Sequence, residues 1–147
     1  NLADAWRKFD FSKTIWVEDE SRQLGRCGIP DPLFQQIREA PMIKIDVPKI
    51  YREKRLVKEY GSFDKTLLHE MIEKIKKRLG GLVTSEAHNA LESGDLLKVA
   101  SLTLTYYDKA YDFGIAKRDA EKVIELALEK DDPMQNVEGI KKLLIKS

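Results

Sequence analysis

The segment TIWVEDESRQLGR, residues 14–26, joins a short apolar run to three consecutive acids. Residues 14–17 are β-branched or aromatic, which favours a buried strand. Glu18, Asp19 and Glu20 follow directly, and three adjacent carboxylates repel one another unless a cation or hydrogen-bond donors offset the charge. The segment therefore predicts a strand that ends at a polar site.

The acids of this segment divide by strand geometry. Successive side chains of a strand point to opposite faces, so Glu18 and Glu20 share one face and Asp19 takes the other. An acid at the end of an apolar strand has the Walker B form, in which a carboxylate holds Mg²⁺ beside bound phosphates. Glu18, the first acid, is our candidate metal ligand. The alternative is a strand end whose acids are merely solvated.

The composition limits the classes of function. Lys and Arg number 26 and Asp and Glu number 25, so the net charge is +1 and any polyanion site must come from a local cluster. Cys27 is the single cysteine, which excludes an internal disulfide and favours a reducing cytoplasm. Only two histidines could bind zinc together with Cys27, so a zinc site is disfavoured. No apolar run approaches the roughly 20 residues of a membrane-spanning helix.

Helical and strand-like segments alternate through the first part of the chain. Residues 2–9 have the pattern of a helix end, and residues 31–39 that of a helix with Asp31 as N-cap. Residues 42–48, MIKIDVP, alternate apolar side chains as a strand does, and 49–60 follow as a helix. This order predicts parallel strands joined by helical crossovers.

Beyond Gly61 every segment is predicted to be helical, and Trp6 and Trp16 are assigned to the core. The predicted helical segments are 64–81, 84–95, 95–114, 117–131 and 134–147. The expected fold class is α/β: the back half of a P-loop NTPase-like parallel sheet unit in residues 1–61, followed by an all-helical C-terminal region in 62–147.

The phosphate-binding partner of a Walker B strand does not occur in the sequence. No G-x-x-x-x-G-K-[ST] is present, so we expect the strand and loop that would carry it to precede residue 1. Arg52 and Arg55 lie three apart on one face of the helix after the second strand. Small P-loop kinases use such arginines to clamp phosphates. The alternative is an ordinary charged helix face.

Taken in order, several segments resemble the C-terminal half of bacterial tRNA 2-selenouridine synthases. The resemblance runs through nearly the whole chain, and its most specific parts are E-x-E-S-x-x-(I/L)-G-R and YYDKAYD. The segments are WVEDESRQLGR (16–26), IPDPLF (29–34), IDVP (45–48), KKRLGG (76–81) and YYDKAYD (106–112). The family joins a rhodanese domain to a P-loop domain.

The resemblance implies an activity: replacement of sulfur by selenium in 2-thiouridine at the tRNA wobble position. It implies selenophosphate as selenium donor and a geranylated intermediate made from geranyl diphosphate. The family's catalytic cysteine belongs to the rhodanese domain, which lies outside these residues, as does the P-loop. Cys27 occupies a position that the motif does not demand, so we interpret it as a small loop residue and expect no catalytic residue in this fragment.

The family motif falls on Glu18, Glu20, Ser21, Gly25 and Arg26, with Asp19 at its free position. The implied role of this segment, with the neighbouring Arg22, is to form the diphosphate and metal side of a P-loop crevice, with Mg²⁺ as the expected ion. The helix that carries Arg52 and Arg55 would form a lid-like wall of the same pocket.

Two further clusters could meet tRNA, and each also has a simpler interpretation. Lys74, Lys76, Lys77 and Arg78 could contact phosphates or form a solvated helix face. Tyr107 and Tyr111 lie four apart on one face and, with Lys109, could stack on an unpaired anticodon base or line a prenyl pocket; the alternative is core. His69 and His88 show no nucleophile or metal spacing and are interpreted as surface or boundary residues.

The preferred hypothesis is therefore a transferase fragment of a tRNA 2-selenouridine synthase, inactive by itself. Its expected partners are the tRNA anticodon region and the N-terminal rhodanese and P-loop portion, on the same or a separate chain; no membrane is expected. One alternative is a fragment of a P-loop kinase-like enzyme. Another is a non-catalytic helical module that binds RNA or protein.

Overall fold

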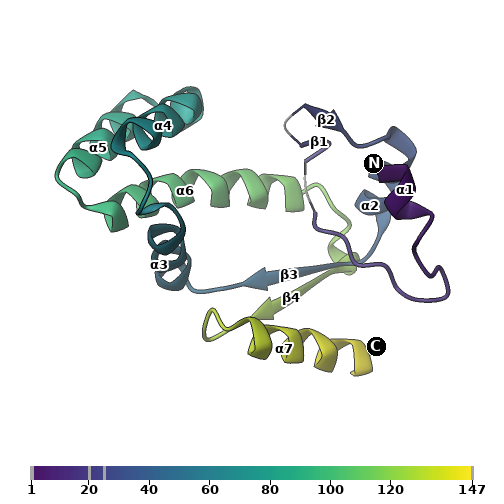
Figure 1. Ribbon diagram of the computed structural model, residues 1–147. Coiled ribbons are helices and arrows are strands. Elements are labelled where there is room, and N and C mark those ends of the chain that lie inside the picture. Colours follow the sequence, from purple (N-terminus) through teal and green to yellow (C-terminus); the bar gives the residue numbers. More distant parts are fainter. Residues whose placement is uncertain (1, 20, 25, 147) are drawn as a thin grey trace. The chain divides into compact units, whose positions relative to one another are not determined.

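The computed structural model describes residues 2–19, 21–24 and 26–146, and the chain divides into two compact units (Figure 1). The first unit is Asn1–Met42 and the second is Ile43–Ser147. Each has its own secondary structure and its own set of contacts, and each is described by itself below.

The first unit contains two short helices and a small hairpin. These are α1 (Leu2–Trp6), β1 (Gln23–Leu24), β2 (Cys27–Gly28) and α2 (Asp31–Glu39). Strands β1 and β2 are antiparallel, with Gln23 opposite Gly28. Helix α2 confirms the helix predicted at 31–39, but Pro30 takes the N-cap position and Asp31 is the first helical residue. The N-cap assignment was wrong because the Asp31 carboxylate pairs with Arg22 rather than with the backbone of its own helix.

The predicted buried strand at residues 14–17 is wrong. This segment is neither helix nor strand, and Trp16 and Val17 are 55% and 51% exposed. Strand propensity describes how well a side chain packs against a neighbouring strand, and no such neighbour pairs with 14–17 among the described residues. The core assignment of Trp16 is therefore also wrong, whereas Trp6 is half-buried and packs edge-on against Phe9, with ring centroids 5.6 Å apart.

The second unit combines a two-stranded parallel sheet with five helices and one short 3₁₀ turn among its described residues. In chain order these are β3 (Met42–Asp46), α3 (Lys49–Tyr60), α4 (Lys65–Leu79), α5 (Gly81–Glu92), α6 (Leu96–Ile115), the turn Ala120–Lys122, β4 (Val123–Ala127) and α7 (Pro133–Lys146). Strands β3 and β4 run side by side in the same direction, with α3 to α6 inserted between them in sequence (Figure 1). The expected α/β class, with parallel strands and a helical C-terminal region, is confirmed.

Strand β4 corrects one predicted element. We expected a continuous helix over 117–131, but Val123–Ala127 is extended and pairs with β3. The backbone N–H of Leu128 donates to the carbonyl of Asp46 at 2.8 Å, just beyond the two strands. Lys44 of β3 reaches Glu125 of β4 at 3.4 Å. Long-range pairing with a strand about 80 residues earlier overrides the helical periodicity, and local sequence cannot reveal such pairing.

Helices α4, α5 and α6 pack together around the core of the unit. Ile72, Ala87 and Leu91 form its buried centre. Gly80, with φ of 84°, joins α4 to α5 in a conformation that suits glycine, and the two helices run antiparallel as a hairpin. Asp64 and Asp95 cap α4 and α6 by accepting from Thr66 N–H and Lys98 N–H. Helix α3 packs against α6 on another side.

Candidate functional site

In the acidic segment, the ion pair among the described residues is formed by Asp19 and not by Glu18. Arg38 of α2 lies 3.3 Å from both carboxylate oxygens of Asp19, and both side chains are about three-quarters buried. Glu18 is exposed. Because 14–19 is not a strand, the alternation that placed Glu18 and Glu20 on one face does not apply to the described residues. Glu20 lies outside them, and Glu18 as metal ligand stays a prediction.

The second half of the motif forms the β1–β2 hairpin. Ser21 Oγ donates to the carbonyl of Gln23 at 2.7 Å, and Arg22 forms an ion pair with Asp31 of α2. Arg26 is exposed in the turn, Gly25 lies outside the described residues, and Cys27 is exposed in β2. Arg22 and Asp31 link the hairpin to the helix that follows it. The assignment of Ser21, Arg22 and Arg26 to a diphosphate site is not tested by these contacts.

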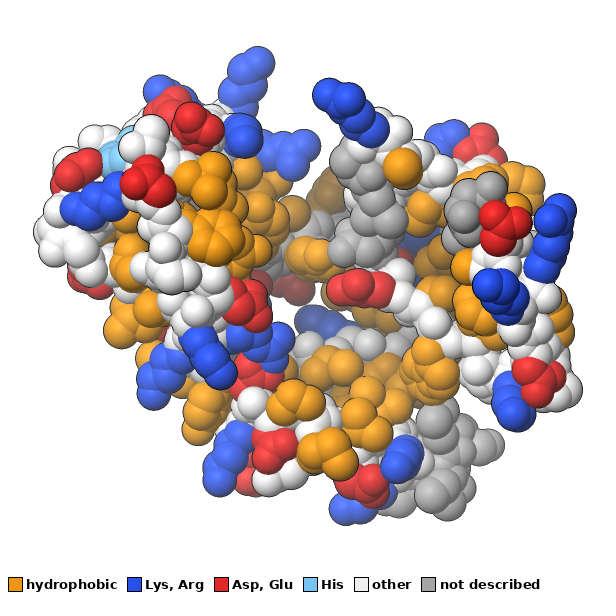
Figure 2. Space-filling view, in the orientation of Figure 1, with side chains coloured by type: hydrophobic (Ala, Val, Ile, Leu, Met, Phe, Trp, Pro, Cys, Tyr) orange, Lys and Arg blue, Asp and Glu red, His pale blue; other side chains and the backbone are white. Residues whose placement is uncertain are grey.

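The second unit contains a cavity of about 410 Å³ between α3, α4 and α6. Its walls are mainly aliphatic, with several polar side chains among them. Aliphatic members are Leu56, Val57, Leu68, Ile75, Val99 and Leu104, and polar members are Arg52, Tyr60, Thr103, Tyr107, Asp108 and Tyr111. Figure 2 shows apolar side chains gathered over the region of these helices. An apolar hollow with a few polar groups is typical of a small-molecule binding site.

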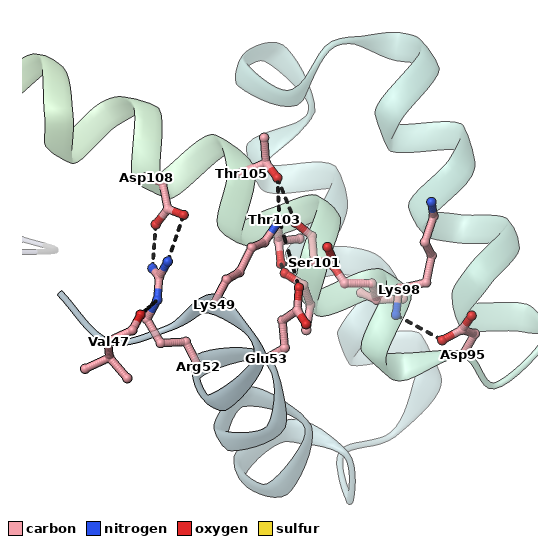
Figure 3. A network of polar contacts seen from close by, with 12 residues as sticks. Val47, Lys49, Arg52, Glu53, Asp95, Lys98, Ser101, Thr103, Thr105 and Asp108 are labelled. Carbon is pink, nitrogen blue, oxygen red and sulfur yellow. Dashed lines mark hydrogen bonds and ion pairs between the residues drawn. The ribbon is translucent and has the colours of Figure 1, made fainter. Parts of the chain in front are cut away.

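Arg52 is fixed in this cavity by a planar fork of hydrogen bonds (Figure 3). Its Nη1 and Nη2 donate to the two carboxylate oxygens of Asp108 at 2.6 and 3.0 Å, and its Nε donates to the carbonyl of Val47 at 3.1 Å. The hydrogen bond with Asp108 raises the pKa of the Arg52 guanidinium, against the opposing effect of partial burial. These bonds use three of its five N–H groups, so the fork holds the guanidinium and leaves further donors to meet a ligand.

Arg52 and Arg55, which were predicted to act together, form ion pairs with different parts of the chain. Arg55 pairs with Asp131, in the segment after β4, whereas Arg52 pairs with Asp108 in α6. Lys49, at the start of α3, donates to Thr105 Oγ1 at 3.0 Å (Figure 3). Of the two arginines, Arg52 lines the cavity and Arg55 is not among its lining residues. Only Arg52 of this pair is therefore positioned to meet a ligand there.

Tyr107 and Tyr111 share a face of α6, as predicted, and both line the cavity. They are 44% and 53% exposed, so the alternative that they belong to the core is wrong. Lys109, between them in sequence, is exposed and is not among the lining residues. The structure thus brings both tyrosines to the same cavity as Arg52, and this grouping was not apparent from sequence.

The basic run on α4 divides into two kinds of residue. Lys76 pairs with Glu73 at 3.1 Å, and Arg78 Nη1 donates to the hydroxyl of Tyr106 at 3.0 Å. Lys74 and Lys77, three residues apart, are exposed, and no ion pair of theirs occurs among the described residues. Figure 2 shows Lys and Arg side chains projecting around this end of the helical region.

His69 and His88 lie at the boundary between core and surface, as predicted, but sequence reasoning missed that they meet. Their Nδ1 atoms are 2.6 Å apart, and each ring reaches a glutamate of the other helix. The signal was present: His-x-x-x-Glu occurs in α4 as His69 and Glu73 and in α5 as His88 and Glu92. Two such pairs on adjacent antiparallel helices place four titratable groups in one row.

The second unit is thus an α/β unit with two parallel strands, a helical insertion between them and a mainly apolar cavity. The sequence profile of the tRNA 2-selenouridine synthase AAA domain matches residues 2–132 of the chain. The chain belongs to this family, and the resemblance noted in the sequence is confirmed. No solved structure matches the chain.

Curated relatives carry the same name. The tRNA 2-selenouridine synthase of Shewanella sediminis is 31% identical over 142 residues, which covers 77% of this chain and 38% of that protein. That of Marinobacter nauticus is 26% identical over 140 residues, covering 75% of this chain and 38% of the relative. That of Aeromonas salmonicida is 48% identical, but over 44 residues. The chain thus spans less than two-fifths of the relatives' length.

The helices of the described residues differ from a membrane-spanning helix in length or in apolar character. None of them has both the length and the apolar character required to cross a lipid bilayer. The longest of those helices, α6, runs from Leu96 to Ile115 and carries Lys98, Asp108, Lys109 and Asp112.

Proposed function

We propose that this chain is part of a tRNA-modifying transferase that replaces sulfur by selenium in wobble 2-thiouridine through a geranylated intermediate. Selenophosphate and geranyl diphosphate are the substrates of the complete enzyme in this proposal. The role of this chain is to help bind the geranyl and diphosphate groups, together with the P-loop portion of the complete enzyme, and to help dock tRNA. Family membership supports the reaction class, and the α3–α4–α6 cavity supports the binding role.

The observation that carries the proposal is the position of Arg52 at a mainly apolar cavity. A volume of about 410 Å³ lies in the range of small-ligand pockets. A branched C10 chain is apolar and would be driven into such walls by removal of its surface from water. The remaining guanidinium donors of Arg52 would meet the diphosphate, for which a planar fork of N–H groups is well matched. Asp108 holds the guanidinium in place.

The tRNA role is assigned to exposed groups of the same unit. Lys74 and Lys77 would neutralise backbone phosphates, with Lys76 and Arg78 beside them. Tyr107 and Tyr111 would serve the substrate's base or the prenyl chain at the cavity lining. These residues fall on α4 and α6, two of the three helices that line the cavity.

In the first unit, the motif residues are proposed to form the diphosphate and metal side of a P-loop crevice. Mg²⁺ commonly takes one or two carboxylates and completes its shell with phosphates and water. No group of three or more ligating side chains that could hold a metal occurs among the described residues, so Glu18 fits only as a single carboxylate ligand of this kind. Bound there, Mg²⁺ would neutralise diphosphate charge. Arg22 and Arg26, in the same unit as Glu18, would add positive charge to that crevice.

The test uses the complete synthase and this chain side by side. Val99→Trp would fill the cavity from α6, and we expect geranyl transfer to fall by at least tenfold while tRNA binding is retained. Val137→Trp, at an exposed site of α7 away from the cavity lining, is the matched control. Full geranyl transfer by the Val99 variant would refute the binding role. The chain alone should show neither selenium transfer nor tight geranyl diphosphate binding, and turnover by it would contradict the proposal.

The two alternatives make different predictions. A kinase-like P-loop enzyme would transfer phosphate from a nucleotide and would be insensitive to filling of the apolar cavity. A non-catalytic helical module would keep the complete protein's activity after Glu18→Ala and Arg55→Ala, yet lose RNA affinity when Lys76 and Lys77 are changed. Loss of geranyl transfer in the cavity variant therefore separates the proposal from both.

A further inference from the structure

His69 and His88 form the centre of a four-residue row across the α4–α5 hairpin. The two rings lie nearly parallel and edge to edge, with centroids 4.7 Å apart, planes inclined by 21° and the two Nδ1 atoms between them. At the outer ends, His69 Nε2 lies 2.6 Å from Glu92 Oε1 and His88 Nε2 lies 2.8 Å from Glu73 Oε1. Each histidine thus bonds the glutamate of the opposite helix, and the inner nitrogens meet at 2.6 Å.

The number of ring protons decides whether this row is stable. Hydrogen bonds from His88 and His69 are the main cause lowering the pKa values of Glu73 and Glu92, so both carboxylates are ionised at neutral pH and can only accept. Each Nε2 must therefore donate. With those two protons alone, both Nδ1 atoms would face each other with lone pairs at 2.6 Å, which is repulsive. A third proton between them turns this repulsion into a hydrogen bond.

We infer that His69 and His88 share one proton between their Nδ1 atoms and that this proton latches α4 to α5 in a pH-sensitive way. Three ring protons complete three hydrogen bonds. A neutral pair has two ring protons and leaves one bond unmade, whereas a doubly charged pair has four and opposes two N–H groups. The latch is complete only in the intermediate state, with one positive charge between two carboxylates.

The groups around the row favour this state. Lys76 Nζ lies 3.1 Å from Glu73 Oε2, and Lys65 Nζ lies 3.9 Å from Glu92 Oε2, so each carboxylate has a second cation that helps to keep it ionised. Helix α6, which packs against both helices, meets their core with apolar side chains such as Leu96 and Val99. Histidine atoms reach the surface next to acidic side chains (Figure 2). Solvent protons can therefore reach the latch.

A metal ion does not fit the same place. Imidazole nitrogens bind zinc at about 2.0–2.1 Å, so two nitrogens 2.6 Å apart would have to bind at an angle narrower than a right angle. The described residues also contain no cluster of three or more side chains able to hold a metal. A separation of 2.6 Å suits, by contrast, a short charge-assisted hydrogen bond.

The latch also bears on the cavity wall. Leu68 and Ile72, each the residue before a member of the row, line the cavity from α4. When the central bond is broken, we expect α4 to separate from α5 more readily and the wall to loosen. This consequence follows from the helix packing alone and does not depend on the ligand that the cavity takes.

The test is nitrogen-15 NMR of the imidazole rings in this chain, whose two histidines give four ring nitrogens. Near neutral pH we expect both Nε2 atoms protonated and a third proton shared by the two Nδ1 atoms. Both acidification and alkalinisation should remove the sharing, and the protection of α4 and α5 amides against hydrogen exchange, corrected for the intrinsic exchange rate at each pH, should then fall by about tenfold. Two ring protons at neutral pH, or two independent rings, would overturn the inference. Ring nitrogen shifts report this count even if the shared proton exchanges too fast to be seen.

Variants of the outer carboxylates provide the control. Glu92→Gln and Glu73→Gln keep the side-chain shape but remove the negative charge, and we expect the third proton to leave the pair at a lower pH than in the unaltered chain. Glu70→Gln, an exposed change on the same helix, should leave the titration as it was. Added ZnCl₂ should leave the ring shifts unchanged. Stoichiometric zinc binding at the two Nδ1 atoms, or identical titrations in all three variants, would refute the shared proton.

Discussion

The two compact units of this chain are stabilised by different kinds of contact. In Ile43–Ser147, Ile72, Ala87 and Leu91 form a buried core, and all residues that are buried in the described part of the chain belong to this unit. In Asn1–Met42 the described side-chain contacts include exposed ion pairs, the largely buried pair of Arg38 with Asp19, and a small aromatic group around Trp6. The acidic family motif therefore lies in the unit with less apolar burial, whereas YYDKAYD lies in the unit with the buried core.

This difference has a simple energetic basis. A fully buried Leu side chain contributes about 1.5–3 kcal/mol from its removal from water, whereas an exposed ion pair contributes about 0–1 kcal/mol. The acidic motif consists mainly of charged and polar residues, which suit recognition of an anion or a metal. In the helical unit, apolar residues pack together in the core and also line the cavity. The acidic motif and the buried apolar core thus lie in separate units.

The largest expected effect is a core change in the second unit. Leu91 is fully buried, so Leu91→Ala should lower the free energy of unfolding by about 2–5 kcal/mol, because apolar packing is removed and a cavity remains. Urea titration followed by circular dichroism measures this. Trp16→Ala, at a 55% exposed site in the first unit, should change it by less than about 0.5 kcal/mol. Equal effects of the two changes would remove the contrast between the units.

Next in size is the Arg52 fork. Asp108→Asn removes the carboxylate that orients the guanidinium, and because both side chains are about a third exposed we expect a stability loss of only about 1 kcal/mol. In the complete synthase, the KM for geranyl diphosphate should rise by about tenfold with a smaller change in kcat. Asp112→Asn, on the same helix and paired with Lys44, is the control. If both variants behave alike, Arg52 has no special role in binding.

A smaller effect is expected from the exposed lysines of α4. Replacing Lys74 and Lys77 by Ala should weaken tRNA binding about equally for all tRNAs. The slope of log K against log salt should fall by about one for each phosphate that is no longer neutralised. Filter binding over a series of salt concentrations measures the slope. Lys58→Ala, an exposed change in α3, provides the comparison. An unchanged slope in the double variant would remove α4 from the tRNA surface.

The smallest predicted effect is the acid sensitivity of the α4–α5 hairpin. The pKa values of Glu73 and Glu92 are lowered from 4.5 by their hydrogen bonds to His88 and His69. Between the lowered values and 4.5 the unfolded chain binds more protons than the folded chain, so this stabilisation is present above about pH 4.5 and is lost as the pH falls further. Thermal unfolding from pH 7 to pH 3 should show the loss.

The matched variants sharpen this prediction. The double change Glu73→Gln and Glu92→Gln should flatten the dependence of Tm on pH between pH 5 and pH 3, whereas Glu70→Gln should keep it. If Tm falls equally steeply with pH in the unaltered chain, the double variant and Glu70→Gln, the Glu73 and Glu92 carboxylates contribute nothing to the pH dependence of stability.

Local sequence is sufficient for several of the helices. Those predicted at 31–39, 49–60 and 64–81 follow from apolar periodicity and from breakers such as Gly61 and Gly80, and the structure confirms them, the last as Lys65–Leu79. The predictions for residues 14–17 and for β4 were wrong in opposite ways, because the first was predicted to be a strand and is not, whereas the second was predicted to be helical and is a strand. Both errors have the same reason. Whether an apolar run becomes a strand depends on a partner strand elsewhere, and the run itself carries no information about that partner.

For the candidate site, residue types could be predicted but their grouping could not. The sequence by itself determined the family, through the E-x-E-S-x-x-(I/L)-G-R and YYDKAYD segments, and the α/β class, through the order of its periodic segments. Only the tertiary structure decided that Arg52 meets Asp108 across 56 residues and that His69 meets His88 across 19. Helical periodicity reports which side chains share a face, but the neighbours of that face are set by how separate helices pack.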